Sequence, residues 1–385
     1  MKARGEGSIS TQDRYDALAR FQEMPARSVA KPGRSWKHDL AKVDFSATSF
    51  DLGCEAPLVL EHAGLAIEDF HHARERRPAE FERAFGKALD TRDDKFASLA
   101  LAFNCGGIFV AVPDGAALDE PLVVGYEVAG PSTFPYTLVH VGARARVTIV
   151  EQLLGDADDG FICGLTELVL EDGAELTYVV DQRIAGRSRA LFTRRAVLGK
   201  DAKLSFCAAE LGAEHSVHRL RVLEAGTGAQ TEVAALFFTR GNQHVEVESE
   251  TIHAAKATQS RTVVRSAGIE RGQGRYFGNI KILANAHGAD ASLRDDALLL
   301  SEDARVDSIP ALEIAANDVK AFHGATVGSI SEDELFYAQS RGITRTDAER
   351  MIALGFFEPA LSRFPGDALR TELRETLAGK FEPSL

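Results

Sequence analysis

The sequence predicts a mainly β protein, with a β-helix in the middle of the chain and helical regions on either side. The first observation behind this prediction is a pattern that begins at Ile108. From there, short runs rich in β-branched and aromatic residues alternate with turn residues for about 200 residues. No long amphipathic helix separates these runs, so a parallel sheet built from alternating strands and helices is not expected.

The second observation is an internal repeat. The segments 145–149, 174–178 and 202–206 share one order of residue types: alanine, a charged residue, an aliphatic residue, a hydroxyl residue and a large apolar residue. Their alanines are 29 and 28 residues apart, and Ala229 begins a weaker copy 27 residues later. A strand-rich period of this length indicates a β-solenoid or a propeller. A propeller blade needs about 40 residues and its own motif, so a β-helix with one turn per repeat is the better interpretation.

The N-terminal region has helical periodicity. A helix is expected over 13–21, and apolar residues between 66 and 104 recur at spacings of three and four, which is the helical period. Residues 96–112 contain no charge, but Asn104 and a Gly-Gly pair interrupt them. We therefore expect a helix that ends near Asn104, followed by a strand, and not a membrane span.

Helical patterns return near the C-terminus. Ser331 is the expected N-cap of a helix that Gly342 ends, and a capping box over 346–349 begins a second helix that ends at Gly355. A last helix carries a leucine stripe at spacing four, which either packs within its own domain or docks a partner subunit. The stripe consists of Leu369, Leu373 and Leu377.

The 385 residues are 45% hydrophobic and 26% charged, which is the composition of a globular protein and not of a disordered one. The patterns divide the chain into an N-terminal helical region (1–104), a β-helix core (105–315) and a C-terminal helical domain (316–385). With 44 basic and 57 acidic residues the net charge is −13, which makes nucleic acids and anionic membranes improbable partners.

Residues 1–10 lack the apolar core of a signal peptide, so a cytoplasmic protein is expected. The four cysteines, at positions 54, 105, 163 and 207, include no CxxC pair. We expect them to be reduced and mostly buried.

The sequence contains no P-loop, HExxH or GxSxG motif, and the glycines at 272, 274 and 278 have the wrong spacing for a dinucleotide site. We therefore do not expect an enzyme. The histidines are mostly expected to be structural. The exception is His323, because Gly324 and Gly328 leave it unhindered; a neutral imidazole there could bind iron or zinc, or it could be a structural histidine.

One enzymatic alternative remains open at this point. A β-helix can present carboxylates that act on an acidic polysaccharide. The candidate pairs are Asp295–Asp296 and Glu302–Asp303, although all four have the character of turn residues.

Residues 317–343 closely resemble the signature of the SufB/SufD family, the scaffold proteins of SUF iron–sulfur cluster assembly. The specific match extends upstream to 310–314 and downstream over 348–357, and less specific similarity is found at 35–40, 94–99 and 108–121. The resemblance implies a right-handed parallel β-helix between two helical domains, which agrees with the fold expected from the repeat.

Within the family, the HGATVG segment at 323–328 and the chain length are similar to those of SufD-type members. SufB-type members carry a cysteine where this chain has Arg294 or Asp295, and no cysteine follows Cys207. A SufD-type scaffold is therefore expected, with a SufB-like homodimeric scaffold as the alternative. Many SufD-type chains also carry a cysteine where this one has Ala321.

The resemblance implies partners and a transient ligand. A SufB-type subunit would pair with the β-helix, and a SufC-type ATPase would bind the C-terminal helices. No cofactor is expected to stay bound, but a nascent iron–sulfur cluster shared with SufB would lie near His323, a possible iron or cluster ligand. The residues expected to contact partners are Phe336, Tyr337, Arg341, Leu369, Leu373 and Leu377.

Overall fold

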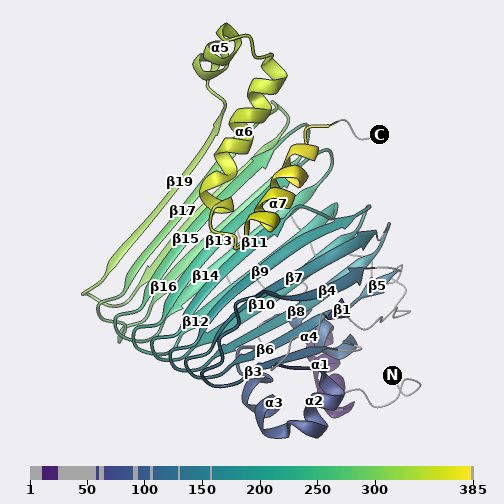
Figure 1. The fold of residues 1–385 in the computed structure, drawn as a ribbon, viewed down its shortest axis with the longest axis vertical. Helices are drawn as coiled ribbons and strands as arrows, with labels where there is room; N and C mark the ends of the chain where they lie inside the picture. The colour runs from purple at the N-terminus through teal and green to yellow at the C-terminus, as the bar shows by residue number, and fades with distance from the viewer. Residues whose placement is uncertain are drawn as a thin grey trace.

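The centre of the molecule is a parallel β-solenoid (Figure 1), which confirms the predicted β-helix. The computed structural model describes residues 11–24, 58–59, 65–89, 94–104, 107–128, 131–156 and 158–382. Successive strands of these residues alternate between two sheets.

The nine-stranded sheet contains, in order, β1 (Leu58–Val59), β4 (Leu122–Val128), β7 (Arg146–Asp156), β9 (Glu175–Ala185), β11 (Lys203–Glu210), β13 (Gln230–Thr239), β15 (Gln259–Gly268), β17 (Asp290–Leu299) and β19 (Lys320–Ser329). The ten-stranded sheet contains, in order, β18 (Arg305–Ile314), β16 (Gln273–Ile282), β14 (His244–His253), β12 (His215–Glu224), β10 (Arg189–Leu198), β8 (Phe161–Leu170), β6 (Tyr136–Val141), β3 (Ile108–Val112) and β2 (Ala66–Asp69), with β5 (Ser132–Thr133) beside β8. Strands β1 and β2 pair antiparallel to their neighbours, and the other pairs are parallel.

The repeat seen in the sequence is one turn of the solenoid. The residue after each repeat alanine occupies the same register position, with Glu175 between Arg146 and Lys203 on the neighbouring strands. Hydrogen bonds join consecutive copies along the sheet. The backbone amide of the residue after each repeat alanine donates to the carbonyl of the alanine in the previous copy, as Lys203 does to Ala174. All four alanines are fully buried: Ala145, Ala174, Ala202 and Ala229. The nearly constant spacing of the repeat alanines therefore follows from the stacking of the strands.

A left-handed residue precedes each of these alanines. Arg144 and Asp201 have φ angles of 57° and 54°, and Gly173 and Gly228 have 69° and 76° at the equivalent places. A positive φ turns the chain sharply and favours Gly, Asp and Asn over other residues. This backbone conformation explains why each copy of the repeat follows a turn.

The helices cover the outside of the solenoid. They are α1 (Thr11–Glu23), α2 (Phe70–Arg76), α3 (Pro78–Ala84), α4 (Lys95–Phe103), α5 (Glu332–Ser340), α6 (Arg345–Leu361) and α7 (Asp367–Gly379). The N-terminal helices pack on the ten-stranded sheet, and α6 and α7 pack on the nine-stranded sheet. Figure 1 shows α5 projecting beyond the strand ends. Among the described helices, none is long and apolar enough to cross a membrane.

Several expected boundaries differ in the structure. Residues 66–69 form strand β2, antiparallel to β3, and only the residues after them are helical. Strand β19 extends the solenoid to Ser329, beyond the boundary expected at 315. The segment 35–40 lies outside the described residues.

The expected end of α4 is confirmed, since Asn104 is its C-cap and β3 follows. The capping box expected over 346–349 is wrong. Thr344 is the N-cap of α6, and its hydroxyl accepts a hydrogen bond from the Asp347 amide at 3.1 Å. The helix continues past Gly355 to Leu361, because the apolar residues there, such as Phe357, are buried against the sheet. Tertiary burial outweighs the weak helix propensity of one glycine.

Candidate functional site

The C-terminal end of the solenoid is formed by two edge strands. β19 pairs with β17 and ends the nine-stranded sheet, while β18 pairs with β16 and ends the ten-stranded sheet. Apolar side chains are exposed here: Ile314 by 46%, Phe322 by 60% and Val327 by 47%. An edge strand presents backbone N–H and C=O groups that can pair with another chain. This end of the solenoid is therefore suited to docking a further β-sheet.

His323 lies on the inner face of β19. It stands opposite Leu293 of β17, which is buried in the core between the sheets. Side chains alternate along a strand, and neighbours in register share a face, so His323 also points inward. Its ring is partly buried, and Nδ1 is buried without a hydrogen-bond partner in the described part of the chain. Such an imidazole nitrogen can bind a metal ion.

Asp295 is a second polar residue on this inner face. It is fully buried on β17, and its carboxylate accepts a hydrogen bond from the Ser308 hydroxyl on β18, across the interior. Burial, together with the charge of Asp296, raises the pKa of Asp295 to about 7, although the Ser308 hydrogen bond opposes the rise. The last turn of the solenoid thus contains a carboxyl group that titrates near neutral pH.

Asp296 points to the opposite, outer face. Its carboxylate forms ion pairs with Arg265 at 2.5 Å and with Arg294 at 2.9 Å, and it accepts a hydrogen bond from Thr326 on β19 at 2.5 Å. Burial alone would raise the pKa of Asp296, but the Thr326 and Arg294 hydrogen bonds and the charge of Arg265 outweigh it and lower the pKa. These contacts tie the outer face of β19 to its neighbours.

These positions correct one expectation about the carboxylates. Asp295 and Asp296 are strand residues, not turn residues, and their side chains lie on opposite faces of β17. Glu302 and Asp303 are exposed in a turn, as expected. The adjacent pair therefore does not form the two-carboxylate site that glycoside hydrolysis requires.

The described cysteines are buried. Cys163 and Cys207 are free thiols, and the other two cysteines lie outside the described residues. Burial raises the pKa of the Cys207 thiol to about 12 and that of Cys163 well above its usual value. Neither thiol forms a thiolate at neutral pH, so neither is an accessible nucleophile. Among the described residues, no three His, Cys, Asp or Glu side chains lie close enough together to hold a metal ion.

The projecting helix α5 carries an exposed aromatic pair. Phe336 is 73% exposed and Tyr337 is 63% exposed. The guanidinium of Arg341 lies 5.2 Å from the centre of the Tyr337 ring. The opposite side of α5 is anchored to α6 through Leu335 and Ala338, which are buried. The helix is therefore held in place while its aromatic face remains open to solvent.

The leucine stripe of the last helix packs within the chain. Leu373 and Leu377 are fully buried, and Leu369 packs beside them, against α6 and the nine-stranded sheet. Of the two alternatives for this stripe, packing within the domain is the one observed. Among the residues expected to contact partners, Phe336, Tyr337 and Arg341 are the ones at the surface.

The sequence reasoning missed the Asp295–Ser308 contact and the Thr326–Asp296 contact, since both join residues of different strands. The sequence did contain a signal for the Thr326–Asp296 contact, because these two residues are 30 positions apart, close to the period of the repeat. No periodicity relates Asp295 to Ser308, whose strands belong to opposite sheets.

Comparisons with known proteins agree with this architecture. Residues 125–356 match the family model described as SUF system FeS cluster assembly, SufBD core domain. The iron–sulfur cluster assembly protein SufB of Bacillus subtilis (strain 168) is 27% identical over 310 residues, which are 80% of this chain and 67% of the relative. An iron–sulfur cluster assembly SufBD family protein of Staphylococcus epidermidis (strain ATCC 12228) is also 27% identical, with the same coverage.

Proposed function

Because the chain belongs to the SufBD family of iron–sulfur cluster assembly proteins, we propose that it is a SufD-type, non-catalytic scaffold subunit. It pairs with a SufB-type subunit, and together they work with a SufC-type ATPase. One observation carries the proposal: the edge strand β19 combines an open backbone edge, exposed apolar side chains and an inward-facing imidazole.

The proposed partner of the solenoid is another β-solenoid of the same family. Pairing β18 and β19 with the edge strands of a SufB-type subunit would continue both sheets across the interface. It would also bury Phe322 and Val327, which are exposed in the single chain. A nascent iron–sulfur cluster at this interface would be cargo and not a resident cofactor.

His323 is the group that this chain offers to that cluster. Its Nδ1 atom lacks a hydrogen-bond partner in the described residues, so binding a metal ion would break no contact that the structure shows. The remaining ligands would come from the partner, since thiolates are the usual ligands of such clusters and no cysteine follows Cys207 here. Ala321 takes the place of the cysteine found in many SufD-type chains.

The second proposed partner is the ATPase, docked on α5. The sequence lacks a P-loop, so nucleotide hydrolysis would belong to another subunit. Phe336 and Tyr337 form an exposed aromatic pair, and aromatic residues together with arginine dominate many protein interfaces. Leu369, Leu373 and Leu377 pack against α6 and the nine-stranded sheet, and α5 packs on α6 through Leu335 and Ala338.

A SufB-like scaffold that forms a homodimer is the second candidate, because the relative from Bacillus subtilis is named SufB. In this case the same edge strands would pair with a second copy of the chain. The absence of a cysteine near Asp295 argues against the sulfur-accepting role of a SufB-type chain, but not against a homodimer.

Co-expression with the SufB-type and SufC-type proteins of the same source tests the proposal. The complex is purified by gel filtration, and light scattering measures its mass. One copy of this chain in a stable complex with both partners is the expected result. A homodimer that binds neither partner would contradict the SufD-type role and favour the second candidate.

A further inference from the structure

A basic pocket lies on the outside of the ten-stranded sheet, where the N-terminal helical region covers it. The cavity has a volume of about 520 Å³, within the range of small-molecule sites. Four cationic side chains line it: Arg20, Lys87, Arg195 and Arg221. The described residues that line it include no acidic side chain, although the whole chain has a net charge of −13. The charge of the described lining is therefore opposite in sign to that of the whole chain.

The floor of the pocket consists of a charged row and an apolar row of side chains. Arg195 of β10 stands directly beside Arg221 of β12 in the parallel register. Two residues further along, Val197, Leu223 and Ile252 occupy equivalent positions on β10, β12 and β14. Because side chains alternate along a strand, both rows share the outer face. A ligand that lies on this floor meets guanidinium groups at one end and aliphatic groups at the other.

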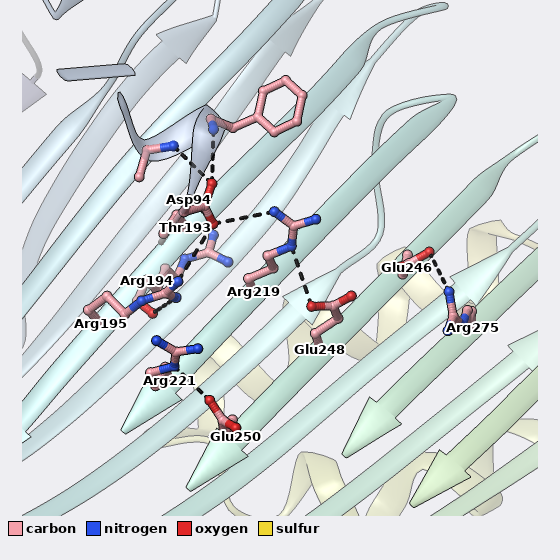
Figure 2. Close-up of polar contacts among 12 residues, drawn as sticks. Asp94, Thr193, Arg194, Arg195, Arg219, Arg221, Glu246, Glu248, Glu250 and Arg275 are labelled. Atoms are coloured by element: carbon pink, nitrogen blue, oxygen red, sulfur yellow. Dashed lines mark hydrogen bonds and ion pairs between the residues drawn. The ribbon is translucent and has the colours of Figure 1, made fainter. Parts of the chain in front are cut away.

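The carboxylates behind the pocket are shared among several arginines. Figure 2 shows Asp94 between Arg195 and Arg219, at 3.6 Å and 3.3 Å. Asp94 also caps α4, accepting hydrogen bonds from two backbone amides. Arg221 pairs with Glu250 at 2.6 Å. The Asp94 carboxylate is thus divided between two guanidinium groups and a helix N-terminus, which leaves the charge of Arg195 incompletely balanced.

Two further observations point to an anion as the occupant. Burial, together with the charges of Arg221 and Arg219, lowers the pKa of Arg195 to about 10, although the charges of Asp94 and Glu250 oppose this. On the other wall, the Nε atom of Arg20 is buried without a hydrogen-bond partner in the described part of the chain. A buried donor without a partner is unfavourable, and an oxyanion in the pocket would satisfy it.

We propose that this pocket binds a small organic phosphate, a phosphate monoester attached to an apolar group. Four cations suit the nearly double negative charge of a monoester better than a single carboxylate. Guanidinium groups bind phosphate oxygens with paired hydrogen bonds. The apolar part of the ligand lies against Val197, Leu223 and Ile252. This inference does not depend on the proposed scaffold function, because the pocket is on the N-terminal side of the solenoid, away from β19 and α5.

Isothermal titration of the full chain with phenyl phosphate, inorganic phosphate and benzoate tests the proposal. Saturable binding of phenyl phosphate is expected, at least about tenfold tighter than inorganic phosphate and tighter than benzoate. If inorganic phosphate binds equally well, the apolar row contributes nothing and the proposed ligand class is wrong. If benzoate binds equally well, the preference for phosphate is wrong. If no probe binds saturably, the site itself is refuted.

Variants of the lining residues test whether the ligand binds in this pocket. The double variant Arg20→Gln/Lys87→Gln is expected to weaken phenyl phosphate binding about tenfold or more, because it removes two of the four cations. Lys256→Gln is the matched control, since Lys256 is an exposed cation of a turn outside the pocket. If the double variant fails to fold, Lys87→Gln alone is used; Lys87 is exposed, and a loss of about threefold is expected. Unchanged binding in the folded variant, or an equal loss in the control, would overturn the assignment.

Discussion

The Nδ1 atom of His218 lies 3.0 Å from the Oε2 atom of Glu210, although the two residues belong to strands of opposite sheets. The same carboxylate accepts a hydrogen bond from Arg194 at 2.9 Å. All three side chains are buried inside the solenoid. Burial alone would raise the pKa of Glu210, but the charges of His218 and Arg194 lower it. The interior of this β-helix thus contains a cluster with a buried Arg194–Glu210 ion pair that connects its two sheets, while burial lowers the pKa of the neighbouring His218.

Replacing one member of this cluster is expected to destabilise the fold. Glu210→Gln would leave the buried Arg194 without its nearest counter-charge, at a cost of about 3–5 kcal/mol of the free energy of unfolding. Urea unfolding measures the loss. As a control, the double variant Arg194→Met/Glu210→Leu removes both charges, so its loss is expected to be smaller. An equal or larger loss in the double variant would contradict the explanation by an unpaired charge.

The raised pKa of Asp295 predicts that the stability of the folded chain depends on pH. Its pKa is about 7 in the folded chain against an ordinary 3.8, so the folded state holds the proton more strongly than the unfolded state. Stability from this residue is therefore complete below pH 3.8 and is lost as the pH rises through 7. Asp295→Asn mimics the protonated form, so it is expected to stabilise the chain at pH 8 and to have almost no effect near pH 4.

The stability gained by Asp295→Asn has an upper limit. The rise of the pKa from 3.8 to about 7, at about 1.4 kcal/mol per pH unit, corresponds to about 4 kcal/mol of the free energy of unfolding. Thermal or urea unfolding across the pH range measures the difference between the variant and the wild type. A gain that is independent of pH would show that the effect does not come from the titration of Asp295.

His323→Ala is expected to abolish cluster assembly by the complex while the complex itself still forms. In the proposed role the imidazole is a cluster ligand, and its removal breaks no hydrogen bond of Nδ1, which has no partner among the described residues. Reconstitution with iron and sulfide, followed by absorption spectroscopy, measures the cluster. His287→Ala is the matched control, because His287 is exposed in a turn. Normal assembly in His323→Ala would remove the proposed role of this residue and leave the scaffold role intact.

Charged substitutions at the edge strand are expected to prevent pairing with the SufB-type subunit. Phe322→Lys/Val327→Lys places two charges on the exposed end of β19, and charges on an edge strand oppose pairing. The stability of the single chain is expected to change by less than about 0.5 kcal/mol, because both side chains are exposed. Binding of the ATPase subunit is the internal control and is expected to remain. A double variant that still pairs would exclude this edge as the interface.

Substitutions on α5 are expected to give the opposite pattern. Phe336→Asp/Tyr337→Asp should abolish binding of the ATPase subunit and preserve pairing of the solenoids, which gel filtration with each partner separates. Truncation before Arg341 should also abolish ATPase binding. It also removes α6 and α7, whose buried residues cover the nine-stranded sheet. The point variants are therefore the sharper test, and ATPase binding that survives them would contradict the assignment of α5.

The sequence by itself determined the architecture. The alanine repeat at spacings of 29, 28 and 27 predicted stacked strands, because a parallel solenoid returns each turn to the same register. Local signals also located the ends of α4 and α5, since Asn104 is the C-cap of α4 and Gly342, with a positive φ, follows the C-cap of α5. The segment around His323 indicated the family, which the match over 125–356 confirms.

Only the tertiary structure decided which side of each strand faces the interior at the end of the solenoid formed by β18 and β19. Asp295 and Asp296 are neighbours in sequence, yet one is buried beside Ser308 and the other pairs with arginines on the outer face. The leucine stripe of α7 was equally compatible with a partner and with the core until its contacts placed it against the sheet. Burial and contact between distant strands depend on the whole solenoid. A local sequence pattern records the spacing of its turns but not which side chains meet across them.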